Sequence, residues 1–312
     1  MSPPWEALKN LLRQLWPWVI PHRIYLTLRT RFALVFADVP ELAPGARNAP
    51  PELLLLSANR VLLDMHLGER CFVLCNGPSV LKQNLDLLEG ESVMSVSSGY
   101  HHPLFKRFRP KYHCLPQITY GVFGEDDAVA WFREMHEGLG EAELFLNCTE
   151  EPLVRRHGLF PGRTVRYVWL SGDMDHMSSA EIPDLSRAIP GVQSVSVMCL
   201  MIAMYMGFRR IYLLGVDHDQ FRTGEYKYFY SPTVLSGKDS DVAADGKVRT
   251  SRHDEFQALA RLWRQYRRMR QVADVNGIEI FNATAGGELD EFPRVELADL
   301  LGVAAVTSTQ AS

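Results

Sequence analysis

The chain has 312 residues, of which 46% are hydrophobic and 22% charged, and its formal net charge is −4. This length and composition exclude a disordered chain and predict one large or two modest domains around a sizeable core. The net negative charge argues against a nucleic-acid binder that neutralises phosphates over a broad surface. Five cysteines are too few for a disulfide scaffold, so we expect a reducing, cytoplasmic location.

Positive charge is concentrated at the start of the chain. Residues 1–37 carry five Lys or Arg residues and one Glu, with three tryptophans and many aliphatic residues between them. Charged residues interrupt the apolar runs, so no membrane-spanning helix is predicted here. Two alternatives stay open: contact with a membrane surface, and packing on the main domain or on a second copy of the chain. Pro17 and Pro21 break any single long helix.

A proline-rich stretch over residues 40–51 marks a domain boundary. We therefore expect a helical extension and linker over residues 1–50 and a main domain over 51–304. The polar end over 305–312 is expected to be a frayed tail. The main domain is predicted to open with a helix over 51–67, which a following glycine closes.

The first informative segment combines a strand, a turn and a helix. Residues 71–75 are a continuous apolar run, as a buried parallel strand requires, and residues 80–88 have a helical pattern. Free N–H groups at a helix start attract anions, and Gly77 permits close approach of a ligand to the backbone. A simple chain reversal is the alternative function of the turn between them, Asn76-Gly77-Pro78-Ser79.

The remaining apolar and amphipathic runs alternate along the chain. Strands are predicted over residues 92–96, 110–115, 143–146, 211–216 and 279–282, and helices over 126–137, 195–206 and 254–276. This alternation predicts a doubly wound, mostly parallel α/β sheet of the Rossmann-like type.

Polar residues follow two of these strands, at the edge where open α/β sheets bind ligands. Ser97 and Ser98 come after the second strand, and Asp217-His218-Asp219 come after the strand over 211–216. The long irregular stretch over 220–252 predicts a lid or binding loop.

Three segments together resemble one bacterial group: residues 73–79, 194–219 and 280–284. They are similar to the glycosyltransferase family 42 sialyltransferases and to related proteins of surface-polysaccharide gene clusters. The same superfamily includes central domains of motility accessory factors and a hydroxymethylpterin pyrophosphokinase. The resemblance covers residues 60–300 in order and spacing, and it implies the glycosyltransferase A variant type of the predicted sheet.

The resemblance implies a glycosyltransferase of surface-glycan biosynthesis, such as that of lipopolysaccharide or capsule. It would transfer a sugar from a nucleotide donor, with a CMP-type donor favoured, to a glycan or lipid-linked acceptor with inversion. No tightly bound cofactor is implied. The location implied is cytoplasmic, including the inner face of the cytoplasmic membrane, and the oligomeric state stays open.

The resemblance also implies roles for individual residues. Tyr226 and Tyr228, with Tyr230 as a further candidate, would hydrogen-bond the departing phosphate. His253 is the best positional match to the general base. His218, which stands between two aspartates, is an alternative base that the residues suggest independently of the resemblance. The resemblance implies nucleotide binding by Asn76, Gly77, Ser79 and Ser194 or Ser196. By their positions beside these residues and at the strand ends, Pro78, Ser97, Ser98 and Asp219 are further expected nucleotide-binding residues.

Some positions depart from the pattern of the family. Ser97 and, approximately, Pro116 stand where the sialyltransferases have nucleotide-binding asparagines. Cys75 replaces the first glycine of the turn, and Asp219 replaces a tyrosine. These departures leave the donor sugar open.

The pair Asp217 and Asp219 has three alternative interpretations. Two carboxylates at a strand end hold Mg²⁺ or Mn²⁺ against a diphosphate in many transferases. In the second interpretation Asp217 supports the turn structurally, and in the third the pair orients a ligand without a metal. Of the three, metal binding is not the favoured one. For the whole chain, an ATP- and Mg²⁺-dependent pyrophosphokinase and a non-catalytic scaffold are the alternatives to a glycosyltransferase. The histidines 101, 102 and 113 are expected to pack or to face solvent rather than to bind metal.

Overall fold

The computed structural model describes residues 51–117, 124–223, 228–230 and 251–302. The predicted extension over residues 1–50, the tail over 305–312, Tyr226 and most of the predicted lid lie outside the described residues.

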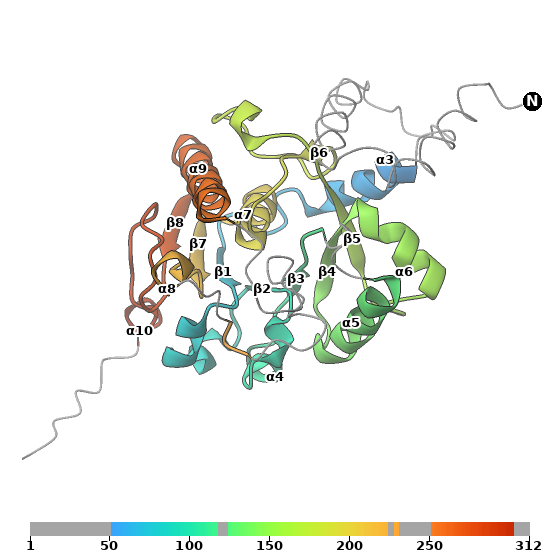
Figure 1. The fold of residues 1–312 in the computed structure, drawn as a ribbon, viewed down its shortest axis with the longest axis horizontal. Helices are drawn as coiled ribbons and strands as arrows, with labels where there is room; N and C mark the ends of the chain where they lie inside the picture. Colours follow the sequence, from blue (N-terminus) through green and yellow to red (C-terminus); the bar gives the residue numbers. More distant parts are fainter. Residues whose placement is uncertain (1–50, 118–123, 224–227, 231–250, 303–312) are drawn as a thin grey trace, which may run out of the picture.

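The centre of the described chain is an eight-stranded sheet with the order β6-β5-β4-β3-β2-β1-β7-β8 (Figure 1). Every pairing between neighbouring strands is parallel. The predicted α/β class with a doubly wound parallel sheet is therefore confirmed. The strands are β1 Arg70–Leu74, β2 Val93–Val96, β3 Tyr112–Cys114, β4 Glu143–Asn147, β5 Val165–Leu170, β6 Ala188–Ile189, β7 Arg210–Leu214 and β8 Glu279–Asn282.

Helices cover both faces of the sheet (Figure 1). The α-helices are α3 Pro51–Ser57, α4 Phe105–Phe108, α5 Glu125–Gly138, α6 Glu151–His157, α7 Val195–Tyr205, α8 Gln220–Thr223, α9 Arg252–Asn276 and α10 Leu297–Leu300. The 3₁₀ helices are η1 Ala58–Leu62, η2 Pro78–Lys82, η3 Leu85–Leu88, η4 Gly99–His101, η5 Cys148–Glu150 and η6 Met174–His176.

Alternate residues of the strands enter two separate cores. In β1, Cys71 and Val73 join the core under α7 and α9, whereas Phe72 and Leu74 join the core under α4 and α5. This follows from the two-residue period of a strand, whose side chains point to opposite faces. Both faces are covered, so the strands are continuous apolar runs.

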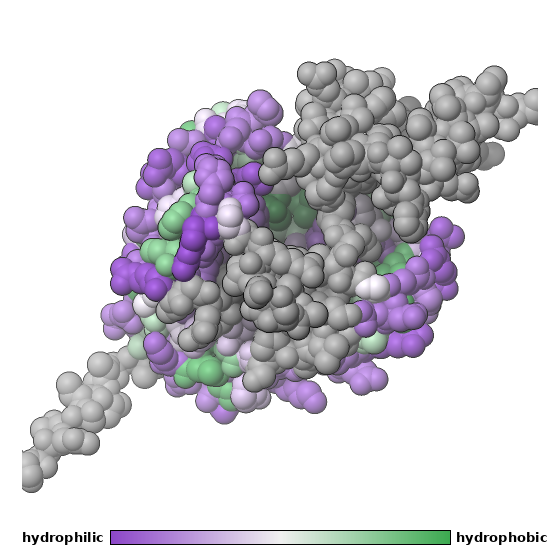
Figure 2. All heavy atoms as spheres, viewed as in Figure 1, coloured by the Kyte–Doolittle hydropathy of each residue, from purple (hydrophilic) through white to green (hydrophobic). Residues whose placement is uncertain are grey.

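α7 and α9 differ in pattern because they lie at different depths. α7 is buried along nearly its whole length between the sheet and α9, and a helix that is apolar all round belongs in such a core. α9 buries only a stripe of six residues. Figure 2 shows that its outer surface is mostly hydrophilic, and the arginines 261, 264, 267 and 270 are exposed there, as expected of a solvated helix face.

The strand order reverses between β1 and β7. The chain builds β1 to β6 in one direction and then returns to the other side of β1 with β7 and β8. β1 and β7 pair in register from Arg70 with Arg210 to Leu74 with Leu214, so both strands end at the same level. Segments that follow two such strands diverge at a topological switch point, where open α/β sheets bind ligands.

Two helix predictions were wrong in extent, and two strands were not predicted. The helix that begins at Pro51 ends at Ser57 and continues as η1. Residues 80–88 do not form one helix, because Gln83 is extended and the Asn84 side chain accepts a hydrogen bond from Asp86 N to start η3. β5 is rich in the β-branched and aromatic residues that favour strands, so its pattern was present in the sequence but was not used, whereas β6 has only two residues and gives no pattern.

Among the described residues, no helix has both the length and the apolar character needed to cross a bilayer.

Candidate functional site

Two segments meet at the switch point: the turn after β1 and the residues after β7. Gly77 N donates a hydrogen bond to Gly215 O at 3.0 Å. The Asp217 carboxylate accepts two hydrogen bonds from Ser79, one from its backbone N at 3.1 Å and one from Oγ at 2.7 Å. The Ser79 N–H, which a phosphate-binding turn would leave free for its ligand, therefore serves the protein's own carboxylate.

Asp217 lies in a space that admits no additional side chain. A β-carbon on Gly77 would overlap the Asp217 carboxylate, and one on Gly287 would lie 2.7 Å from the Asp217 Cα. Gly287 also has a φ of +75°, in the left-handed region that favours glycine. Glu288 N donates to Asp217 O at 2.7 Å. A third segment, after β8, thus fixes the backbone of Asp217.

The electrostatics of Asp217 determine which ligand groups suit it. Burial raises the pKa of its carboxyl, and the two hydrogen bonds from Ser79 oppose part of that rise. The nearby charge of Asp219 raises the pKa further. A fixed, partly desolvated carboxylate accepts hydrogen bonds from hydroxyl groups and repels phosphate. Sugar or ribose hydroxyls therefore suit Asp217 better than a phosphate does.

Asn76 follows β1 directly and is only 6% exposed. Its Nδ2 donates to Val96 O at 3.2 Å, whereas its Oδ1 has no hydrogen-bond partner among the described residues. Leaving a buried polar atom without a partner costs about 1–3 kcal/mol, so buried amide oxygens are normally bonded. Asn76 Oδ1 is therefore a candidate ligand contact.

An aromatic segment after β7 lies across the end of β1. Phe229 N donates to Asn76 O at 3.0 Å. The Tyr228 and Tyr230 rings stack with centroids 5.3 Å apart and an interplanar angle of 10°. Burial raises the pKa of the Tyr230 phenol, and the nearby side chains of Ser98 and Asn76 oppose part of that rise. The phenol keeps its proton at neutral pH and can donate it to an anionic oxygen.

A second set of hydrogen-bonded polar side chains surrounds His218. His218 is 7% exposed, and its Nε2 lies 2.7 Å from Tyr266 Oη. Tyr266 Oη is hydrogen-bonded in turn to Ser196 Oγ, and Ser196 Oγ lies 2.7 Å from Ser194 Oγ. Burial lowers the pKa of His218 to about 4, so its imidazole is neutral at pH 7. Its ring packs edge-on against Trp263, with centroids 5.9 Å apart.

The structure thus brings most of the predicted site residues into two groups at the carboxyl edge of the sheet. Ser194, Ser196 and His218 form the second group, joined through Tyr266. The first group consists of Asn76, Gly77, Pro78, Ser79, Ser98, Asp217 and Tyr228, together with Tyr230.

Among the residues that the structure describes, three predicted site residues have no side-chain hydrogen bond to either group. His253 is exposed in the first turn of α9, ten residues before Trp263, which corresponds to about 15 Å of helix axis. Ser97 has a φ of 47°, and its carbonyl accepts a hydrogen bond from His113 Nε2 at 2.8 Å. Asp219 stands just before α8 and is half-buried.

Metal ligands do not cluster in the part of the chain that the structure describes, where no group of three or more His, Cys, Asp or Glu side chains could hold an ion. His113 packs in the core: its Nδ1 lies 2.7 Å from Ser95 Oγ, and burial lowers its pKa to about 3. His102 is also buried and accepts a hydrogen bond from Leu104 N at 3.2 Å.

Tyr266 is the residue of this region that sequence reasoning missed. It is fully buried in the apolar stripe of α9, between Leu262 and Met269. A tyrosine in such a stripe indicates a buried hydroxyl that needs a partner. The partner could not be named, because it comes from segments 48 and 70 residues away in sequence.

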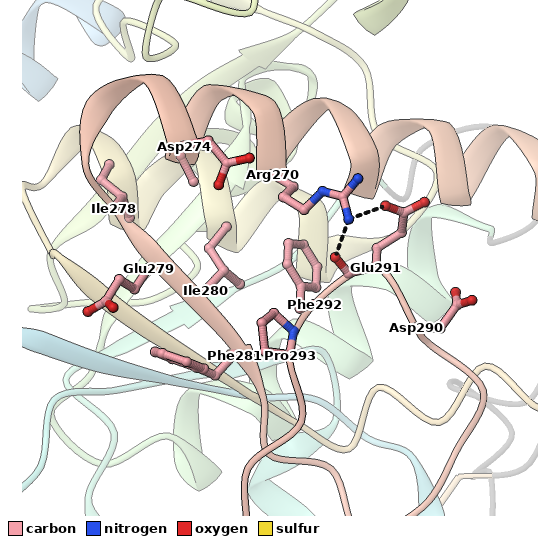
Figure 3. A pocket seen from close by; sticks show the side chains of 11 residues that line it. Arg270, Asp274, Ile278, Glu279, Ile280, Phe281, Asp290, Glu291, Phe292 and Pro293 are labelled. Carbon is pink, nitrogen blue, oxygen red and sulfur yellow. Dashed lines mark hydrogen bonds and ion pairs between the residues drawn. The ribbon is translucent and has the colours of Figure 1, made fainter.

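A surface pocket of about 430 Å³ lies elsewhere, between the end of α9, β8 and residues 290–293 (Figure 3). It includes none of the predicted site residues. Glu291 on its wall is buried and forms ion pairs with Arg267 at 2.7 Å and Arg270 at 3.4 Å, so its charge is already neutralised within the protein.

In comparisons with known proteins, neither a family model nor a curated protein matches this chain. Among solved structures, the chain is similar to the sialyltransferase CstII from Campylobacter jejuni, in complex with the substrate analogue CMP-3FNeuAc. The identity is 13%, the match covers 73% of this chain and 86% of that chain, and the TM-score is 0.41. These values identify neither a substrate nor a reaction for this protein.

Proposed function

We propose that this protein is a glycosyltransferase that transfers a sugar from a nucleotide donor, with a CMP-type donor favoured, to a hydroxyl of a glycan or lipid-linked acceptor. The resemblance of its motifs to glycosyltransferase family 42 supports the proposal. The observation that carries it is the buried Asn76 Oδ1, which has no partner among the described residues and lies at the topological switch point. Nucleotides bind in this position in open parallel sheets.

The surrounding groups divide into acceptors and donors of hydrogen bonds. Asp217 and Asn76 Oδ1 are acceptors, which suit the hydroxyl and amino groups of a nucleoside. The phenol of Tyr230, kept protonated by burial, is a donor that suits the departing phosphate, and Tyr228 stacks on it. Under this proposal the turn after β1 binds the ribose rather than the phosphate, because Ser79 is engaged by Asp217.

Two histidines are candidates for removing the proton of the acceptor hydroxyl, as an inverting displacement requires. His253 is exposed at the start of α9 and is free to approach an acceptor. His218 is neutral and close to Asp217 in the chain, but burial makes it a weak base. Turnover measurements on His253→Ala and His218→Gln test the two candidates. If a variant keeps wild-type turnover, the histidine that it replaces is not the base.

A thermal-unfolding panel with CMP, CDP, UDP, GDP and ATP, each with and without Mg²⁺ or Mn²⁺, tests the donor class. A nucleotide at 100 times its Kd adds roughly 2.7 kcal/mol of stability, which raises the melting temperature measurably. Stabilisation by CMP without metal is expected. Stabilisation by ATP only with Mg²⁺ would favour the pyrophosphokinase, and no stabilisation by any nucleotide would favour the scaffold.

Asn76→Ala provides the site-specific arm of this test. We expect it to weaken CMP binding about tenfold, which corresponds to about 1.4 kcal/mol. Asn59→Ala is the matched control, because Asn59 is also buried with an unbonded Oδ1 among the described residues but donates to Tyr167 O and Leu185 O, away from the switch point. Equal loss of CMP binding in both variants would contradict the proposed site.

A further inference from the structure

The backbone conformation and the burial of His218 indicate that the protein fixes this side chain for a function. Its φ of 46° lies in the left-handed region, which costs energy for a residue that has a β-carbon. Such strain persists only where the surrounding structure enforces it, and here the His218 ring packs against Trp263 and Tyr266 of α9. Its Nε2 is bonded to Tyr266, and its Nδ1 has no hydrogen-bond partner among the described residues.

Four polar groups form one continuous chain of hydrogen bonds, in the order His218, Tyr266, Ser196 and Ser194. Its two ends lie at the same edge of the sheet. His218 follows the carboxyl end of β7. Ser194 is the N-cap of α7, and α7 runs back towards the start of β7, so its first residue is at the carboxyl edge. Ser194 is also partly exposed.

Each member of this chain is neutral and carries one movable proton. Burial raises the pKa of Tyr266 and lowers that of His218, so at neutral pH neither is charged. A hydroxyl donates one hydrogen bond, and a neutral imidazole donates from one nitrogen and accepts at the other. The directions of the bonds are therefore linked from one end of the chain to the other.

Two arrangements of the protons satisfy all the bonds. In the first, Ser194 donates to Ser196, Ser196 to Tyr266 and Tyr266 to His218 Nε2, so that Nδ1 carries the ring proton. In the second, His218 Nε2–H donates to Tyr266, and every later bond is reversed. The Ser194 hydroxyl is then free to donate outward, and Nδ1 presents a lone pair. Between the two arrangements the ring loses a proton at Nδ1 and gains one at Nε2, and the net charge does not change.

We propose that Tyr266 is a positioning residue that couples the tautomer of His218 to the hydrogen-bonding state of Ser194 at the start of α7. An acceptor oxygen of a ligand at Ser194 selects the second arrangement, in which His218 Nδ1 accepts a hydrogen bond. A donor group at Ser194 selects the first. The assignment of that ligand as the nucleotide donor rests on the proposed function, whereas the coupling itself does not.

The test uses ¹⁵N-NMR of the full-length protein with ¹⁵N-labelled histidine and no ligand. The resonances of His218 are assigned by their loss in His218→Gln. In the wild type we expect one nitrogen of protonated type and one of unprotonated type. Tyr266→Phe keeps the ring volume and removes the hydroxyl, and we expect its His218 to show exchange-averaged shifts of a tautomer mixture. Tyr167→Phe, which removes a buried phenol outside this chain, is the matched control.

Ser194→Ala tests the far end of the chain. Ser194 does not touch His218, so a purely structural role of Tyr266 leaves the His218 shifts of this variant at their wild-type values. Coupling predicts that the tautomer ratio of His218 changes by a factor of two or more. Wild-type His218 shifts in Ser194→Ala, whatever Tyr266→Phe shows, would overturn the proposal.

Because no ligand is added, these outcomes stand whether or not CMP binds. Failure of the proposed function appears separately, as the absence of a CMP-induced shift in melting temperature. The thermal midpoints of both variants, measured alongside, establish that they are folded.

Discussion

Ser79→Ala tests the contact that holds the switch point together. The substitution removes the Oγ donor at 2.7 Å from Asp217 and keeps the backbone N–H donor at 3.1 Å. Because hydrogen bonds from Ser79 hold down the pKa of the Asp217 carboxyl, which burial raises, that pKa rises further in the variant. The loss of stability should therefore depend on pH.

The sign of this dependence follows from linkage between protonation and folding. A carboxyl whose pKa is higher in the folded protein than in the unfolded chain resists ionisation in the fold. Stability is then lost as the pH rises from the unfolded value of about 3.9 through the raised folded value. In Ser79→Ala this loss is larger than in the wild type. A hydrogen bond to a charged group contributes about 1.5–3 kcal/mol and one between neutral groups about 0.5–1.5. We therefore expect the variant to lose about 1 kcal/mol more at pH 8 than at pH 4.

Urea denaturation of the wild type and the variant at both pH values measures this difference. Ser92→Ala is the matched control, because the Ser92 hydroxyl accepts a hydrogen bond from Lys111 Nζ at 2.9 Å and does not donate to a carboxylate among the described residues. Its loss of stability should be the same at pH 4 and pH 8. A Ser79→Ala loss that is equal at the two pH values, or larger at pH 4, would refute the role of Ser79 in stabilising an ionised Asp217.

Three further predictions concern packing, chemistry and the start of the chain. Gly77→Ala should destabilise the protein by about 1–3 kcal/mol in urea denaturation, because the added methyl overlaps Asp217 although its φ of −62° suits alanine; unchanged stability would contradict the close contact. Tyr230→Phe should lower kcat about tenfold or more while the KM for the nucleotide-sugar changes little, because a hydrogen bond to the departing phosphate acts mainly in the transition state. A change in KM alone would place Tyr230 in ground-state binding. Deletion of residues 1–37 should abolish flotation with anionic liposomes if that segment contacts the membrane, and unchanged flotation would favour the packing alternative.

The sequence was sufficient to predict the elements that carry a strong local pattern. β1 and β7 are short apolar runs bounded by turn residues, and α9 has a clear apolar stripe and a terminal Gly277 in the left-handed conformation. The 80–88 region has the same helical spacing, yet Asn84 ends it by capping a new turn. Local capping of this kind competes with helix periodicity, and the spacing of apolar residues does not reveal which one prevails.

The candidate site was predictable in its place but not in its contacts. Asn76 and Asp217 follow the two strands at the switch point, and this position follows from the alternation of strands and helices. The bond between Ser79 and Asp217 joins residues 138 positions apart, and no local pattern encodes it. The same limit applies to Tyr266, whose stripe indicates burial while its partners come from other elements.

The hydrogen bonds between Ser79 and Asp217 also change the role expected of the turn over residues 76–79. A Gly-containing turn before a helix suggests a phosphate cradle, because its N–H groups are free and a helix dipole adds positive potential. Here the turn leads into η2, a 3₁₀ helix of five residues, and a carboxylate already bonds the Ser79 N–H. A phosphate in that place would have to displace a buried negative charge. Under the proposed function, the phosphate therefore lies on the side of Tyr230 and the nucleoside on the side of Asp217. This orientation places the hydrogen-bond donor Tyr230 near the phosphate and the acceptor Asp217 near the hydroxyl groups of the nucleoside.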